Sequence, residues 1–363
     1  MMLNLPDLSA ILKIEVVWFK SVVQILSQHL RLKDGSCIMK KTDFESYFQD
    51  RNIPHDDFIL TIKILDEIEA FLSVEIDDLT AESLDKAIEL FYDSNRSNVD
   101  FFVAMMRYMR FIKQHDLFIR LTQYTGGLDV IESIVARMEK LKGHEKALKV
   151  LKRVTLPRLG MKPEDIIFFT ETFMTTLHHE FGPEDIKLIL TGNNHQIPIS
   201  SFEADRIDYE ASNTFEEFLK SKHQRILETL NQHFLENKVW FEQLITKEVI
   251  DYIASDQEML SARLVDDTLY LKKIPYNIDG FLKENDPLQK RYLSCHCPFA
   301  REAILNKKAD ISPLWCYCSA GFEKHPFETV LNQPLKIRVL QSVLNGDDVC
   351  RFAISLDGVE YKK

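Results

Sequence analysis

The stretch that decides the fold is LKIRVLQSVLNGDDVCRFAISL, residues 335–356. In its first half, apolar residues alternate with Lys336 and Arg338, which is the two-residue period of a strand with one buried face. Asn345-Gly346 then suits a turn that needs a positive φ. The return half places four side chains on one face: Cys350, Phe352, Ile354 and Leu356. The stretch therefore predicts an antiparallel hairpin that packs on a core, with Cys350 pointing into that core.

The rest of the C-terminal part shows weaker strand signals, and the part before residue 258 shows helical ones. Residues 268–273 alternate between apolar and polar side chains, and residues 291–296 do the same, so each segment predicts a strand. The earlier part of the chain is apolar at helical spacing. We therefore expect an α+β protein, with a mostly helical N-terminal half and a C-terminal antiparallel sheet covered by helices.

Capping residues mark several of the expected helices. Thr80 precedes a buried stripe made of Leu84, Ala87, Ile88 and Phe91. Thr214 and Glu217 form a capping-box pattern before a helix over residues 215–235. Pro163 suits the first position of another helix, and Gly143 suits the end of one over residues 128–142.

The length of 363 residues allows two domains. We place a boundary in the basic, Pro- and Gly-containing segment near residues 143–161. This predicts a helical domain of unknown role over residues 1–145 and a cysteine-containing α+β domain over residues 160–363.

Composition restricts the partners and the location. A net charge of −11 argues against nucleic acid as the main partner, although nine lysines and arginines lie between Arg137 and Lys162. That segment is read either as a solvated helix face or as a patch for an acidic partner. The apolar stretch over residues 8–30 contains Lys13 and Glu15, so it predicts an amphipathic helix and no membrane span. Thiols in Cys-x-Cys pairs and the lack of an export signal predict a cytoplasmic protein, and a homo-oligomer is one of the states we expect.

Five of the six cysteines gather after residue 294, as Cys295-His296-Cys297, Cys316-Tyr317-Cys318 and Cys350. Three interpretations compete: a zinc site, a thiol-lined pocket for a small molecule, or buried cysteines that act as small apolar residues. The Cys-x-Cys spacing is less suited to zinc than Cys-x2-Cys, so we expect neither a metal nor another cofactor. We expect the thiols to converge on one cavity.

Chemistry is assigned to the residues around these pairs. Pro298 would place Cys297 at a helix N-cap, and Cys318 precedes a similar helix start, so both are expected to have a lowered pKa and to act as nucleophiles. Proton transfer is assigned to His296, Glu302 and Glu323. Ligand binding is assigned to Tyr276, Arg291, Arg301, Cys295, Cys316 and Cys350, with the arginines as clamps for a carboxylate or phosphate.

These same segments carry a family resemblance. Lys273-Ile274-Pro275-Tyr276, the segment from Arg291 to Glu302 and Trp315-Cys316-Tyr317-Cys318 resemble a poorly characterised bacterial family that is similar to the L-2-amino-thiazoline-4-carboxylic acid hydrolases. The segment from Leu344 to Ile354 is similar to the end of vinyl-reductase-like domains, except that Ser342 stands where those domains carry a further cysteine. The resemblance implies an α+β domain that binds a small molecule, with a ring-opening hydrolase as the enzymatic example.

Two functions follow as hypotheses. The first is a protein that binds a small anionic molecule in a cysteine-lined pocket and that, as an enzyme, would hydrolyse a C–N or C–S bond. The second is a ligand or metal sensor without catalysis, whose helical N-terminal half signals to a partner. An enzyme would consume its ligand, whereas a sensor would only bind it.

Overall fold

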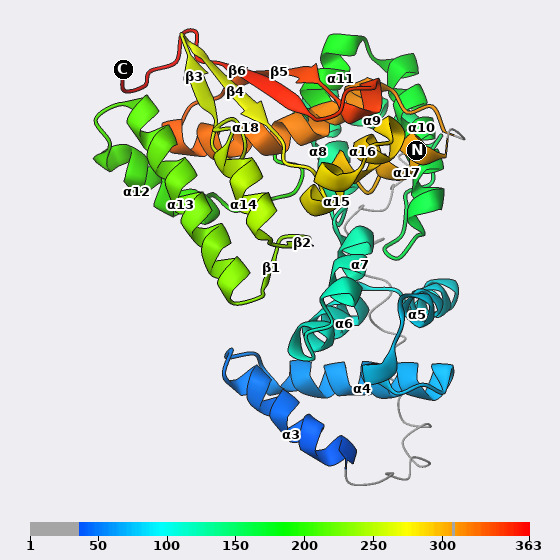
Figure 1. Cartoon of the computed structure of the whole chain (residues 1–363). Helices are drawn as coiled ribbons and strands as arrows, with labels where there is room; N and C mark the ends of the chain where they lie inside the picture. The colour runs from blue at the N-terminus through cyan, green and yellow to red at the C-terminus, as the bar shows by residue number, and fades with distance from the viewer. Residues whose placement is uncertain (1–35, 307–308) are drawn as a thin grey trace. The chain divides into compact units, whose positions relative to one another are not determined.

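The computed structural model describes residues 36–306 and 309–363, with side chains from residue 42 onward (Figure 1). The amphipathic helix expected over residues 8–30 lies outside these residues. The chain divides into two compact units, Met1–Ile59 and Leu60–Lys363. The predicted boundary near residues 143–161 falls inside the second unit and stays a prediction.

The helices and strands follow one another in an order that places most helices before the sheet. The helices are α3 (Ser36–Gln49), α4 (His55–Leu72), α5 (Ala81–Asp93), α6 (Val99–Phe111), α7 (His115–Thr125), α8 (Val130–Lys142), α9 (His144–Leu151), α10 (Pro163–Glu180), α11 (Pro183–Leu190), α12 (Glu203–Ala211), α13 (Phe215–Leu235), α14 (Lys247–Ala254), α15 (Ile278–Lys283), α16 (Pro287–Ser294), α17 (Arg301–Leu305) and α18 (Tyr317–Leu331). Short 3-10 turns are η2 (Ile76–Asp78), η3 (Ile199–Phe202), η4 (Pro313–Cys316) and η5 (Val343–Asn345). The strands are β1 (Val239–Trp240), β2 (Gln243–Leu244), β3 (Arg263–Val265), β4 (Thr268–Lys272), β5 (Lys336–Gln341) and β6 (Arg351–Ser355).

In the described part of the first unit, α3 packs on the beginning of α4 through aromatic rings. The Phe44 and Phe48 ring centroids are 5.0 Å apart, and Phe48 and Phe58 are 5.4 Å apart, both in edge-to-face arrangements. Such pairs add to the stabilisation that burial of the rings already provides.

The capping predictions are confirmed. The Thr80 hydroxyl accepts from the Ser83 N–H, and the Ser83 hydroxyl accepts from the Thr80 N–H, which closes a capping box at the start of α5. Thr214 accepts from the Glu217 N–H at 3.1 Å before α13. Gly143, with φ of 89°, ends α8. Local hydrogen bonds of this kind require only neighbouring residues, so they can be predicted from sequence.

Helices α8 to α11 enclose one hydrophobic core, which we call the helical core. Its most buried members include Ile134, Met138, Ile167, Phe173, Leu177 and Ile189. Phe299, Trp315 and Cys318 come from much later in the chain and pack into the same core. The helical core is therefore continuous with the segments that carry the cysteines.

The predicted hairpin is confirmed as β5 and β6, which belong to a four-stranded antiparallel sheet of order β3-β4-β6-β5. The predicted place of Cys350 in its core is wrong, because Cys350 lies before β6 and packs against Cys295, Ile304 and Val343. Gly346 takes the positive φ, 104°. The last strand in sequence, β6, is central: Phe352 lies opposite Leu271 of β4 and opposite Val339 of β5. Figure 1 shows α18 running along the sheet.

Helices α13 and α18 cover the sheet, and the side chains between these layers form a second core, which we call the sheet core. Its buried members include Phe215, Phe218, Leu269, Leu271, Phe327 and Ile354. This arrangement is α+β, with the helical half preceding a C-terminal antiparallel sheet covered by helices.

The strand predicted over residues 291–296 is wrong. Those residues lie at the end of α16 and in the loop that follows it. Asp286 caps α16 by accepting from the Gln289 N–H at 2.8 Å, and Pro287 occupies the first helical position. Short alternating patterns fit both a strand and a helix turn, and here the cap decides.

Several basic side chains of the segment between Arg137 and Lys162 contact partners within the second unit. Lys142 pairs with Asp185, Arg153 pairs with Glu180, and Lys162 pairs with Glu89. Arg158 lies over the Tyr92 ring, 4.2 Å from its centroid. These contacts join the segment to α5, α10 and α11, and the patch for an acidic partner stays a prediction.

None of the helices in residues 36–306 and 309–363 combines the length and the apolar character needed to cross a membrane.

Candidate functional site

The five C-terminal cysteines lie at the ends of elements that meet in the second unit. Cys295 directly follows α16, and Cys297 lies in the loop before α17. Cys316 ends η4 and caps α18, and Cys318 is the second residue of α18. Cys350 immediately precedes β6. All five are free thiols, whereas the side chain of Cys37 lies outside the described part of the chain.

Cys297 lies at the centre of this thiol cluster. Burial is the largest cause of the raised pKa of Cys295, Cys316, Cys318 and Cys350, and the nearby Cys297 raises each of these pKa values further. Cys297 also packs against the helical core and against a smaller apolar cluster formed by Cys295, Ile304 and Val343. The thiols thus lie close enough to influence one another, and their expected convergence on one cavity stays a prediction.

The surroundings of Cys297 are rich in donors. The Trp315 indole N–H donates to the Cys297 sulfur at 3.1 Å. Burial raises the pKa of Cys297, while Trp315, the N–H groups of Phe299 and Ala300, and the charge of Lys273 oppose that rise.

The expected low pKa of Cys297 and Cys318 is therefore wrong, because burial outweighs the favourable contacts. In addition, α17 begins at Arg301 with Ala300 at its N-cap, so Cys297 does not cap it. Cys318 has its pKa raised to about 12, with burial as the main cause.

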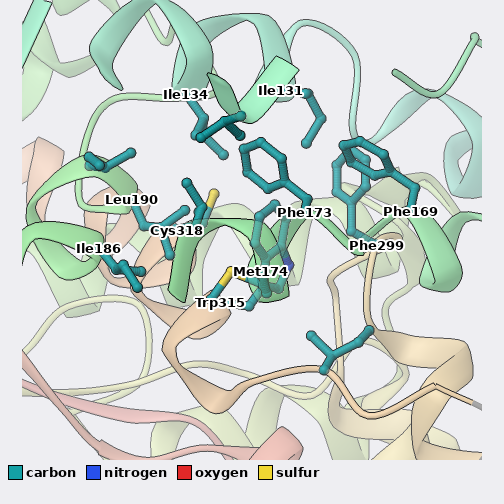
Figure 2. Close-up of a cluster of buried hydrophobic side chains, with 14 of the residues drawn as sticks. Ile131, Ile134, Phe169, Phe173, Met174, Ile186, Leu190, Phe299, Trp315 and Cys318 are labelled. Atoms are coloured by element: carbon teal, nitrogen blue, oxygen red, sulfur yellow. The ribbon is translucent and has the colours of Figure 1, made fainter. Parts of the chain in front are cut away.

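Cys318 faces the helical core. Figure 2 shows it among Ile134, Met174, Leu190 and Trp315. Its sulfur accepts from the Asn194 side-chain amide at 3.5 Å, and Asn194 is itself fixed by donating to the Leu190 carbonyl at 2.6 Å. Cys316 instead contacts the Ser342 hydroxyl at 2.9 Å. Ser342 thus stands as a hydrogen-bonding partner where the resemblance implies a sulfur.

Lys273 is the cation of the site, and it was not among the predicted site residues. Its ammonium donates to the Ser319 hydroxyl at 2.9 Å and lies 3.8 Å from the Glu323 carboxylate, and both Lys273 and Glu323 side chains are only 18% exposed. The charge of Lys273 favours the thiolates of Cys297, Cys318 and Cys350 and so opposes the raised pKa of each. A lysine after an alternating strand gives no sequence signal for this role, because Ser319 and Glu323 lie about 50 residues further along the chain.

Two histidines lie at the edge of the thiol cluster. His296 has its Nε2 2.8 Å from the Ile274 carbonyl oxygen and its Nδ1 3.3 Å from Glu242. His195, from the loop after α11, contacts the Phe322 ring and has its pKa lowered to about 4, first by burial and then by Lys273. Burial is the largest cause of both downward pKa shifts, and Glu242 opposes the shift of each ring.

The two predicted arginine clamps differ in their contacts. Arg291 donates through Nε and Nη2 to the Val343 carbonyl, at 3.0 and 2.6 Å, and so holds η5 in place. Arg301 is buried, and its guanidinium lies over the rings of Tyr276 and Tyr292, 4.3 and 5.2 Å from their centroids. Glu302 accepts from the Tyr292 hydroxyl at 2.7 Å. The roles assigned to these residues in the sequence analysis stay predictions.

The described side chains contain no group of three His, Cys, Asp or Glu residues that is arranged to hold a metal ion. The sulfur atoms of Cys297, Cys316 and Cys318 are instead engaged by Trp315, Ser342 and Asn194.

A cleft approaches the thiol cluster from the side of the helical core. Its lining includes Gly127, Met161, Pro163, Pro298 and Phe299. Phe299 contacts Trp315, with ring centroids 5.7 Å apart, and Trp315 donates to Cys297. Pro298 and Phe299 also directly follow Cys297 in the chain, and the Phe299 N–H acts on the Cys297 sulfur, so the cleft wall adjoins the central thiol.

Fold and site together define an α+β domain in which five free thiols gather around Cys297, with Lys273 close enough to influence three of them. Residues 210–360 match the model of a family of unknown function, DUF6144. The matched region is less than half of the chain and contains Lys273, Arg301 and the five clustered cysteines, whereas Asn194 and His195 lie before it. No curated protein and no solved structure matches the chain.

Proposed function

We propose that the second unit binds a small anionic molecule beside Lys273 and Cys297. The observation that carries the proposal is the placement of the Lys273 ammonium: it is largely buried, has a neutral hydroxyl as its hydrogen-bonding partner, and influences three thiols. A partly desolvated cation attracts an anion more strongly than an exposed one does. Glu323, at 3.8 Å, balances the charge of Lys273 when no ligand is bound.

Lys272 offers a matched control for this proposal. It is the neighbour of Lys273 and is similarly shielded from solvent, but its ammonium pairs with Asp256 rather than with Ser319 and Glu323. Native mass spectrometry of the purified protein should reveal a bound small anion that is lost in Lys273→Met and retained in Lys272→Met. Where nothing co-purifies, a thermal-shift screen of small anions should give hits that depend on Lys273 in the same way. Equal responses of both variants would contradict the proposal.

A second candidate function, thiol-dependent hydrolysis, is favoured by the donors around Cys297. An indole N–H, two backbone N–H groups and a lysine would all stabilise a thiolate once a proton is removed. The sulfur would then attack the carbon of a C–N bond, the nitrogen would leave with a proton, and water would cleave the C–S bond to restore the thiol. Cys297→Ser should abolish turnover and leave ligand binding within a few-fold, whereas Cys318→Ala should weaken binding without abolishing the fold.

The location and partners follow from the same chemistry. Five free thiols in one unit support a reducing, cytoplasmic environment. Self-association into a homo-oligomer and signalling by the N-terminal helices remain proposals. Sedimentation of the purified protein with and without the co-purified ligand would test both of them.

A further inference from the structure

Two buried hydrogen-bond donors near the thiol cluster have no acceptor. The Nε–H of Arg301 and the hydroxyl of Tyr276 each have no hydrogen-bond partner of good geometry among the described residues, although the two groups lie close enough for Tyr276 to raise the pKa of Arg301. Arg301 is 4% exposed and Tyr276 is 8% exposed, so bulk water does not satisfy them. A buried donor that has lost water without gaining an acceptor is destabilising, and more so when it is charged, so such a pair calls for an acceptor from outside the chain.

The two donors belong to one contact. The Arg301 guanidinium carbon lies 4.3 Å from the centroid of the Tyr276 ring. Glu302 is the nearest carboxylate, with its Oε1 3.8 Å from the Arg301 Nε, which is beyond hydrogen-bonding distance. The same oxygen accepts from Tyr292. Glu302 therefore balances the charge of Arg301 without filling the position of the missing acceptor.

We infer that the Arg301 Nε–H and the Tyr276 hydroxyl bind the carboxylate group of the ligand. An ionised carboxylate brings two acceptor oxygens and no donor, and its planar shape matches the edge of a guanidinium group. A water molecule at the same position would bring two donors that need acceptors of their own. A spherical ion such as chloride has no pair of oxygen atoms, so it cannot place one acceptor atom at each of the two donors.

The inference rests on the proposed function, because the same ligand would extend from this pair to the thiol cluster. His296 bridges the two regions: its ring contacts the Tyr276 ring, with centroids 5.5 Å apart, and it is the sequence neighbour of Cys297. The inference narrows the ligand from a small anion to a small carboxylate whose remaining atoms face Cys297.

The test uses acetate as the probe on the full chain, with acetamide as its neutral analogue and chloride at equal ionic strength. Thermal shift and the Arg301 Nε–H signal in a nitrogen–proton NMR correlation spectrum are recorded for each probe. We expect acetate alone to raise the melting temperature and to move the Arg301 signal. Tyr276→Phe, which removes only the hydroxyl, should weaken acetate binding about tenfold, as loss of one hydrogen bond predicts. Arg301→Lys should abolish it.

The controls separate this inference from the proposed function. Tyr252→Phe, which removes a tyrosine hydroxyl on α14, should bind acetate like the unmodified protein. Lys273→Met should keep the acetate response, because acetate occupies only the carboxylate position, while it loses the larger ligand. An equal response to chloride or acetamide, no response to acetate, or an unchanged affinity in Tyr276→Phe would each overturn the inference and leave the Lys273 proposal standing.

Discussion

The indole N–H of Trp315 donates to the sulfur of Cys297 at 3.1 Å, across a separation of 18 residues. Trp315 is 1% exposed and also contacts Phe173 and Phe299 with its ring edge or face. The central thiol is therefore held by a residue that belongs to the helical core. A change in the state of Cys297 would act directly on the packing of that core.

This contact predicts the reactivity of Cys297. Removal of the donor in Trp315→Phe should raise the pKa of Cys297 further, because the indole N–H is the largest of the contacts that lower it. Alkylation by iodoacetamide near pH 8 should then slow by several-fold, as followed by mass spectrometry of the labelled peptide. In the unmodified protein Cys297 should react faster than Cys350. Trp240→Phe, in β1, is the control and should leave the rate unchanged.

The raised pKa of the thiols predicts a loss of stability at alkaline pH. The folded protein keeps Cys318 protonated up to a pKa of about 12, whereas the unfolded chain releases that proton near the ordinary value of 9.0. The stability is fully present below pH 9 and falls as the pH rises from there toward 12, by about 1.4 kcal/mol per pH unit for each such thiol. Urea unfolding at pH 8, 9 and 10 would measure this slope. Cys318→Ala should reduce the slope by the share of one thiol, and an unchanged slope would show that Cys318 titrates normally.

Gly321 predicts a strong intolerance to a side chain. A Cβ at this position of α18 would lie 2.3 Å from the Gly192 carbonyl oxygen and 2.7 Å from the Gly192 nitrogen, and backbone cannot move aside cheaply. Gly321→Ala should reduce the free energy of unfolding by more than about 3 kcal/mol. Gly182→Ala is the control, because no atom lies within 4 Å of its added Cβ, and it should change stability by less than about 1 kcal/mol. Similar unfolding midpoints for the two variants would contradict the close approach.

The pair between Arg351 of β6 and Glu258 predicts a non-additive mutant cycle. Arg351 donates through Nε and Nη2 to both oxygens of Glu258, each at 2.6 Å, and the Glu258 side chain is 10% exposed. Arg351→Met should cost about 2–4 kcal/mol, since it leaves a buried carboxylate unpaired. The double variant with Glu258→Met should recover at least half of that loss in urea unfolding. Additive losses would mean that the two side chains do not interact.

The parts of the fold that depend on neighbouring residues could be predicted from the sequence. Thr80 and Thr214 cap their helices, and the alternation around Phe352 and Ile354 places the hairpin, because each signal lies within a few residues. The alternation from Arg291 to His296 wrongly indicates a strand, because it is short and the cap at Asp286 lies outside it.

The candidate site was predictable only in part. Sequence clustering located the cysteines, but their pKa depends on burial by Phe173, Leu190 and other residues more than 100 positions away. The contacts Lys273–Ser319 and Asn194–Cys318 join residues 46 and 124 positions apart. No local sequence pattern predicts such pairs, because their members meet only when the helical core packs against α18 in the folded protein.

The central position of β6 has a consequence for the order in which the protein can be assembled on the ribosome. Since β6 is synthesised after β3, β4 and β5, the nascent chain presents β4 and β5 with open edges until residue 355 has emerged. Cys350 arrives with that same strand. The thiol cluster is therefore complete only when the last strand inserts, so the four earlier cysteines of the cluster wait without Cys350 while the segment between Cys318 and Cys350 is being synthesised.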